Sequence, residues 1–165
     1  MLNKLRAFRK WYTTITVGIC ATICFVILGM NVVQLIMRYV IDKAFTYTED
    51  ITILGMLWMM SLGISIGCLN HEHLLINIID NIISPENRTK LIFAEDILMI
   101  GVGVAMVILG NLSLQMNKGF TQSMIGFDES FRYLPVVVGG VLTSLVSIEN
   151  VWEQILVWKE AKKKA

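Results

Sequence analysis

The sequence predicts an all-α integral membrane protein with four transmembrane helices. Of its 165 residues, 55% are hydrophobic and only 16% are charged, and the mean hydropathy is +0.65. Soluble domains carry about 25% charged residues. Four apolar stretches are each long enough to cross a bilayer core, which takes about 20 helical residues. We therefore expect one membrane domain over residues 1–165. The net charge of +1 gives no reason to expect nucleic acid as a partner.

The first two spans are predicted at residues 11–37 and 51–69. The first follows a basic segment and begins with Trp11 and Tyr12, which are suited to the membrane interface. It is too long for the apolar part of a signal peptide, and no cleavage site follows it. The second has no charged residue, and as a helix it would be roughly 28 Å long. Both stretches therefore predict membrane-crossing helices.

The last two spans are predicted at residues 91–116 and 131–156. The third carries Glu95 and Asp96 near its start, so we expect these acids close to the interface. The fourth has Pro135 in its first turn or so, where proline removes no intrahelical hydrogen bond. Its apolar pattern becomes amphipathic toward its end, which indicates a helix that continues into the lipid headgroups.

An interfacial amphipathic helix is predicted at residues 73–84, between the second and third spans. Its polar residues recur at helical spacing and the rest are mostly Leu and Ile: Asn77, Asp80, Asn81 and Ser84. Such a helix is expected to lie flat, with its apolar face in membrane lipid or against a partner.

Basic residues predict the orientation of the chain. With four spans both termini lie on one side, and that side carries ten Lys and Arg residues in short segments: Lys4, Arg6, Arg9, Lys10, Arg88, Lys90, Lys159, Lys162, Lys163 and Lys164. The opposite side carries only four: Arg38, Lys43, Lys118 and Arg132. The positive-inside rule then places both termini in the cytoplasm.

Residue types that carry catalysis or bind cofactors form no recognisable site. His71 and His73 would point about 200° apart on a helix, so one metal ion cannot bind both from a single face. Phosphate loops, nucleophile elbows and dinucleotide fingerprints do not occur. We expect no enzymatic activity, no metal and no cofactor in this chain. Three cysteines, an odd number, are interpreted as small packing residues: Cys20, Cys24 and Cys68.

Polar residues in the first span form a stripe toward its outer end. Asn31, Gln34 and Arg38 are spaced i, i+3, i+7. Glu49 and Asp50 follow after a loop of about ten residues, so either acid could meet Arg38. Two interpretations stay open: a surface ion pair that contributes about 0–1 kcal/mol, or a partly buried clamp that fixes the first hairpin.

The second span has two features that indicate close packing. Trp58 lies near its middle, away from the interface where tryptophan is enriched, so its indole N–H needs a partner inside protein. Gly63 and Gly67 form a small-xxx-small pair, which lets another helix approach closely. Either packing within this chain or a partner subunit would use that surface.

The order of several motifs resembles the small membrane subunit of tripartite ATP-independent periplasmic (TRAP) transporters, the DctQ-like subunit. The resemblance covers about residues 38–135 and rests on RYV at 38–40, FTYTEDI at 45–51, Trp58, LG at 62–63, HEHLLINII at 71–79 and the segment that ends at Pro135. By position, Arg38, Glu49, Asp50, Trp58 and His71 match residues of the family. We expect a structural clamp or a partner interface at these residues and at Gly63 and Gly67: Arg38, Glu49, Asp50, Trp58, Gly63, Gly67 and His71.

The resemblance implies an accessory subunit rather than a carrier. A large multi-span permease would hold the substrate and sodium sites and move them by an elevator motion, and a periplasmic binding protein would deliver an organic acid. Sialic acid, other sugar acids and C4-dicarboxylates are all compatible with it. The segment before Pro135 is more charged than the family pattern, so contact with the binding protein is expected at Asp128, Glu129 and Arg132.

Two other functions stay open from the sequence. A small four-helix exporter that works alone as a dimer would need a membrane-embedded acid, which none of the spans has at its centre. A membrane assembly factor would leave transport intact when it is deleted.

Overall fold

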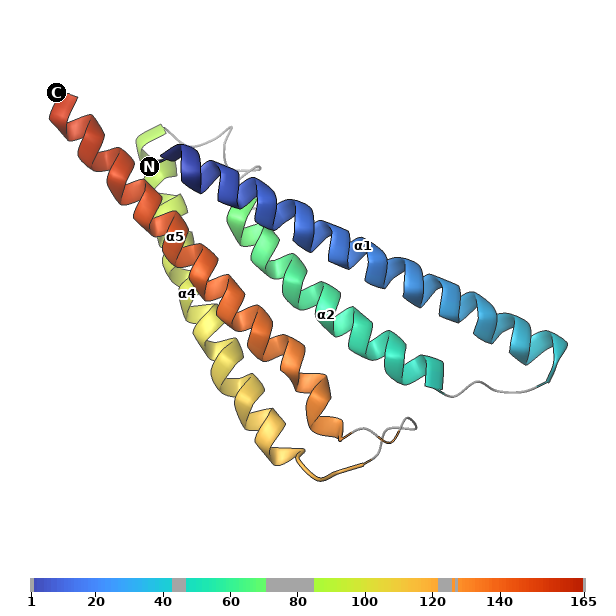
Figure 1. Ribbon diagram of the computed structural model, residues 1–165. Coiled ribbons are helices and arrows are strands. Elements are labelled where there is room, and N and C mark those ends of the chain that lie inside the picture. The colour runs from blue at the N-terminus through green and yellow to red at the C-terminus, as the bar shows by residue number, and fades with distance from the viewer. Residues whose placement is uncertain (1, 43–46, 71–84, 122–125, 127, 165) are drawn as a thin grey trace.

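The computed structural model describes residues 2–42, 47–70, 85–121, 126 and 128–164 of the chain. Four long helices make up most of these residues: α1 at Leu2–Val40, α2 at Tyr47–Asn70, α4 at Pro85–Met116 and α5 at Leu134–Lys164. A short 3-10 helix, η1 at Glu129–Tyr133, leads into α5. Figure 1 shows that the helices run antiparallel in sequence order and that both termini lie at one end. We call this the inner end of the bundle and the opposite end the outer end.

The first three predicted spans fall within α1, α2 and α4, and the fourth, 131–156, begins in η1 and continues in α5. The segments that are long and apolar enough to cross a membrane are Ala7–Val40, Tyr47–Leu69, Lys90–Met116 and Glu129–Leu156. The predicted four-span all-α fold is therefore confirmed, and the chain is a multi-pass membrane protein. The predicted interfacial helix at residues 73–84 lies outside the described residues.

The helices do not contribute equally to the bundle. α4 and α5 lie side by side along most of their length, α2 packs against α5, and α1 packs mainly against α2 (Figure 1). With 39 residues, α1 is about 58 Å long at 1.5 Å per residue, well beyond a hydrocarbon core of about 30 Å. α1 is therefore an arm attached to a compact unit of α2, α4 and α5.

A single narrow seam of α1 faces α2. The buried and half-buried positions along it alternate in steps of four and three residues: Thr16, Cys20, Ile23, Ile27, Met30, Gln34 and Met37. This spacing keeps one line of side chains toward the neighbouring helix. The other faces of α1 are apolar and exposed, up to 78% for Phe25. In a membrane protein such faces contact lipid or another subunit.

Small residues bring the compact helices together. A Cβ on Gly139 of α5 would lie 2.5 Å from the Cβ of Ser61 on α2. A Cβ on Gly103 of α4 would lie 2.8 Å from the carbonyl oxygen of Gly140 on α5. Side chains at these two glycines would push the helices apart, so glycine is needed there. Gly63, by contrast, is exposed, and a Cβ added to it would have no atom within 4 Å.

Candidate functional site

Polar groups from all four helices meet near the inner end in a set that we call the inner cluster. It consists of Arg9 on α1, the Cys68 carbonyl on α2, Asp96 on α4, and four residues of α5, namely Glu149, Asn150, Glu153 and Gln154. The amphipathic pattern after residue 148 places these α5 side chains on the face that packs against the other helices. The inner cluster thus connects segments up to 141 residues apart in sequence.

Asn150 is the central residue of the inner cluster. It is only 1% exposed, and its Oδ1 accepts a hydrogen bond of 2.6 Å from Nη2 of Arg9. Its Nδ2 donates to the carbonyl oxygen of Cys68 at 2.8 Å and to Oδ1 of Asp96 at 3.2 Å. One amide therefore binds α1, α2 and α4 at the same time.

Asp96 is buried between α4 and α5. It is 2% exposed, and its second carboxylate oxygen accepts a hydrogen bond of 2.6 Å from Nε2 of Gln154. An ionised carboxylate is stable in such a place only when hydrogen bonds replace its lost hydration. The sequence predicts that Asp96 lies close to the interface, and the structure adds that protein, rather than headgroups or water, surrounds it.

Arg9 closes the inner cluster on the side of α1. Its Nη2 lies 2.8 Å from Oε2 of Glu153, and its Nε lies 3.4 Å from Oε1 of Glu149. The three side chains are about one-fifth exposed, so solvent screens these ion pairs only in part. Nearby, the hydroxyls of Tyr12 and Ser65 form a hydrogen bond of 2.7 Å between α1 and α2. The inner cluster therefore holds the first turns of the arm on the compact unit.

A second set of polar contacts, the outer cluster, joins α2 to η1 at the outer end. Arg132 forms an ion pair with Asp50 of α2 and another, of 2.9 Å, with Glu129 one turn earlier. Arg132 is therefore shared between two carboxylates. This part of the structure corrects the prediction that Arg38 clamps Glu49 or Asp50, because Arg38 is exposed and pairs with neither acid among the described residues. Met37 is the last residue of the seam. Arg38 comes next in the helix and is rotated about 100° from it around the helix axis, so its side chain points away from α2.

Asp128 fixes the turn that leads into η1. Its carboxylate accepts hydrogen bonds from the backbone N–H of Ser130 at 3.0 Å and of Gly119 at 2.9 Å. These N–H groups favour the ionised form and lower the pKa of Asp128 below its usual value, the one from Ser130 most. Gly119 has a φ of +88°, which favours glycine at this turn. Asp128, Glu129 and Arg132, predicted to contact a binding protein, thus also hold the outer end together.

The remaining predicted site residues are not gathered in one place. Asn31 reaches α2 through a hydrogen bond of 3.3 Å to Oγ1 of Thr52. Trp58 is half-buried on α2. Gly63 faces open space, so close helix packing in this chain uses Gly139 instead of Gly63. His71 lies outside the described residues.

The chemistry of both clusters is that of helix joining. Each consists of carboxylates, amides and an arginine that bind one another, and among the described residues no group of three His, Cys, Asp or Glu side chains could hold a metal ion. Sequence reasoning did not foresee either cluster, because Arg9, Asn150 and Arg132 become neighbours of their partners only through the packing of helices distant in sequence. The polar character of residues 149–154 was the available signal.

Comparison with known proteins gives consistent matches. A family model described as the DctQ component of tripartite ATP-independent periplasmic transporters matches residues 27–157. One Haemophilus influenzae protein, whose name assigns it as a TRAP transporter small permease protein, is 21% identical over 131 residues, which cover 79% of this chain and 81% of the relative. A second protein of that organism, assigned in the same way, is 27% identical over 108 residues, covering 64% of each chain.

Proposed function

Because the chain belongs to the DctQ family of tripartite ATP-independent periplasmic transporters, we propose that it is a non-enzymatic scaffold subunit that assembles with a large permease. The proposal rests on the observation that the clustered polar side chains of this chain bind one another. The inner and outer clusters engage them in joining helices of this chain, while α1 presents exposed apolar faces. Such a subunit offers a rigid, lipid-compatible body to a partner that does the transport.

The proposal extends to the whole transporter. The large permease holds the sodium and substrate sites and moves them by an elevator motion, and a periplasmic binding protein delivers an organic acid anion such as sialic acid, another sugar acid or a C4-dicarboxylate. This subunit binds no cofactor. The family and the four spans support a place in the bacterial inner membrane, and the ten basic residues on the side of the termini support cytoplasmic termini.

Co-purification tests the assembly. The full chain, tagged and extracted from native membranes in mild detergent, is expected to bring down a large multi-span permease at one-to-one stoichiometry, identified by mass spectrometry. Recovery of the chain alone as a homodimer would contradict the proposal and favour a small exporter. A deletion strain that still takes up the organic acid at the normal rate would instead indicate an assembly factor.

A pair of glycine variants tests whether the α2 surface binds that partner. Gly63→Leu is expected to reduce permease recovery, because a leucine would keep a partner helix away from the small-xxx-small surface. Gly101→Leu on α4 is the matched control, since Gly101 is also exposed with no atom within 4 Å of an added Cβ. Equal recovery with both variants would remove Gly63 from the partner interface.

The charged outer segment is proposed to contact the binding protein. Uptake with Asp128, Glu129 and Arg132 all replaced by Ala is expected to fall, while permease recovery stays at the wild-type level. Since Arg132 also joins α2 to η1, the helical circular dichroism and thermal midpoint of the variant are measured alongside. Unchanged uptake by the triple variant would exclude this contact.

A further inference from the structure

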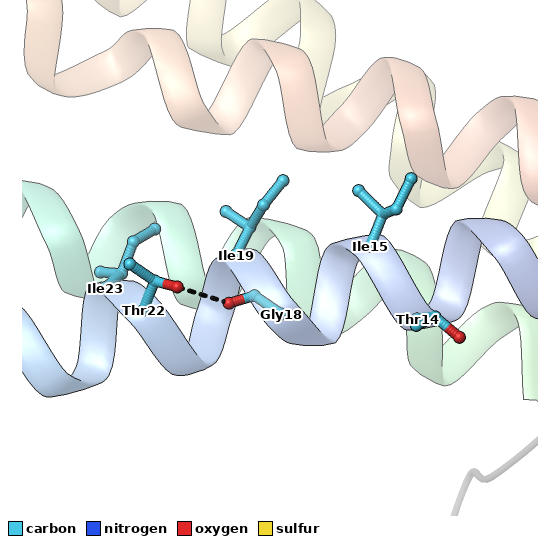
Figure 2. Close-up of a pocket in the computed structure, with 6 residues that line it drawn as sticks. All are labelled: Thr14, Ile15, Gly18, Ile19, Thr22 and Ile23. Atoms are coloured by element: carbon cyan, nitrogen blue, oxygen red, sulfur yellow. Dashed lines mark hydrogen bonds between the residues drawn. The ribbon is translucent and has the colours of Figure 1, made fainter.

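Two grooves run along α1, and they differ in one chemical respect. The first, which we call the α1 groove, has a volume of about 500 Å³ and is formed by one face of the helix (Figure 2): Thr14, Ile15, Gly18, Ile19, Thr22 and Ile23. The second, the α1–α2 groove, has a volume of about 280 Å³ and is lined by residues of two helices: Phe25, Val26, Gly29, Met30, Val33 and Thr48. Both are almost entirely apolar.

The hydroxyl groups of the α1 groove are already satisfied by the helix itself. Thr14 donates to the carbonyl oxygen of Lys10 at 2.8 Å, and Thr22 donates to that of Gly18 at 2.9 Å, as Figure 2 shows for the second pair. Such bonds to the carbonyl four residues earlier are the usual solution for threonine in a membrane helix. The α1 groove therefore offers a ligand no free donor.

Thr48 in the α1–α2 groove cannot use that solution. It is the second residue of α2, so the helix has no carbonyl four residues before it. The residue is 1% exposed, and among the described residues its Oγ1 has no hydrogen-bond partner. A buried hydroxyl without a partner is unfavourable, so Thr48 has a donor that a ligand in the groove could use.

The depth of Thr48 tells which part of a membrane ligand it meets. Asn31 bonds to Thr52, and a Cβ on Gly55 would touch Ile27, so α1 and α2 run antiparallel in a fixed register. In this register Thr48 lies further toward the outer end than Asn31, at the start of an apolar span, whereas Phe25 lies deeper. From residue 33 to residue 25 the groove follows α1 inward for about 12 Å.

We propose that the α1–α2 groove binds one acyl chain of a phospholipid from the leaflet at the outer end of the bundle, with the Thr48 hydroxyl donating a hydrogen bond to its ester carbonyl. A polar handle at the boundary and an apolar groove leading inward match a glycerolipid, whose ester lies where its acyl chain begins. Gly29 borders open space in the groove, since a Cβ added there would have no atom within 4 Å, and a large side chain at this position would occupy that space. A neutral ester also suits this position better than a fatty-acid carboxylate, since Glu49 and Asp50 follow Thr48 directly.

Photo-crosslinking of the full chain in lipid nanodiscs tests the proposal. The probe is phosphatidylcholine with a diazirine on one acyl chain, and mass spectrometry measures the yield on the peptide containing residues 25–33. Gly29→Leu, which fills the groove, is expected to lower this yield about tenfold. Thr48→Val, which keeps the shape and removes the hydroxyl, is expected to lower it about three- to tenfold, the range for one hydrogen bond.

Matched variants of the α1 groove separate a specific site from ordinary lipid contact. Gly18→Leu and Thr22→Val make the same changes on the same helix, and both are expected to leave the yield on residues 25–33 unchanged. An equal loss with either control, or no loss with Gly29→Leu, would overturn the proposal. A diazirine-labelled palmitic acid that competes as well as the phospholipid would overturn the assignment of the ester.

Thermal unfolding in detergent without added phospholipid distinguishes loss of binding from loss of fold. Thr48→Val is expected to raise the midpoint, because it removes an unpaired buried hydroxyl. Added phosphatidylcholine is then expected to stabilise the wild type more than this variant. Equal stabilisation of both proteins would contradict the hydrogen bond from Thr48. Neither measurement depends on the permease, so this proposal fails or holds independently of the proposed function.

Discussion

Replacing Asn150 with aspartate turns an amide into a carboxylate at the centre of the inner cluster without changing the shape of the side chain. The Nδ2 group that donates to the Cys68 carbonyl at 2.8 Å and to Asp96 at 3.2 Å becomes an oxygen that can only accept. Two carboxylate oxygens then face each other at about the 3.2 Å of the present bond. With an effective dielectric constant of about 20, two unit charges at that distance repel by about 5 kcal/mol.

We therefore expect Asn150→Asp to lower the free energy of unfolding by about 3–5 kcal/mol, since Arg9 lies close enough to offset part of the repulsion. Unfolding by dodecyl sulfate in mixed micelles, followed by circular dichroism, measures this change. Asn117→Asp is the matched control, because among the described residues Asn117, in the turn after α4, donates only to the Ser113 carbonyl near the end of that helix, at 2.8 Å. The control is expected to lose no more than about 1 kcal/mol.

The exchanged pair sharpens the test. Asp96→Asn combined with Asn150→Asp restores one amide and one carboxylate at the contact, but it leaves the Cys68 carbonyl without its donor. The double variant is expected to recover about half of the loss, and the coupling between the two sites is expected to exceed about 1 kcal/mol. A loss with Asn150→Asp no larger than with Asn117→Asp, or a double variant no more stable than the single one, would refute this account of the inner cluster.

Three further predictions follow from the packing and the outer end. Arg132→Ala is expected to lower the free energy of unfolding by about 1–3 kcal/mol because it removes the guanidinium that pairs with both Asp50 and Glu129, whereas Arg38→Ala should change it by less than about 0.5 kcal/mol; dodecyl sulfate titration compares them. Gly139→Ala is expected to destabilise α2 against α5 by about 1–3 kcal/mol through its clash with Ser61, while Gly63→Ala should be neutral or stabilising in the same titration. Because the pKa of Asp128 is lowered in the folded state, its contribution to the free energy of unfolding is complete above about pH 4 and is lost as the pH falls through the folded-state pKa. In the wild type, the amide protons of Gly119 and Ser130 should therefore exchange faster at acidic pH, and Asp128→Ala should abolish this pH dependence.

The sequence predicts the fold well because apolar length alone identifies the spans. All four predicted spans lie within helices of the structure, and the depth of Asp96 near the inner end is also readable from its place in the third span. Its burial is not readable, because that depends on Asn150 and Gln154, more than 50 residues later in the chain. Hydropathy fixes position along the membrane normal but not which face of a helix meets which neighbour.

The same limit explains two contacts that the sequence could not place. Arg38 and Arg132 both lie on the outer side, and only the helical phase of α1 decides that Asp50 pairs with the second. Gly63 has the spacing of a packing motif, yet Gly139 makes the close approach to α2. Both outcomes depend on the rotation of a helix about its own axis, which the long-range contacts set.

The tie between Arg9 and α5 has a consequence for how the protein is made. Arg9 lies about 140 residues before its partners Glu149, Asn150 and Glu153, so it leaves the ribosome well ahead of them. The arm can sit in the membrane early, yet its contacts with α5 form only after α5 has been synthesised. A chain that stops short of α5 therefore lacks the side chains that bind Arg9 and that donate to Asp96. The contact between α1 and α5 thus makes the packing of the first helix depend on the insertion of the last helix described.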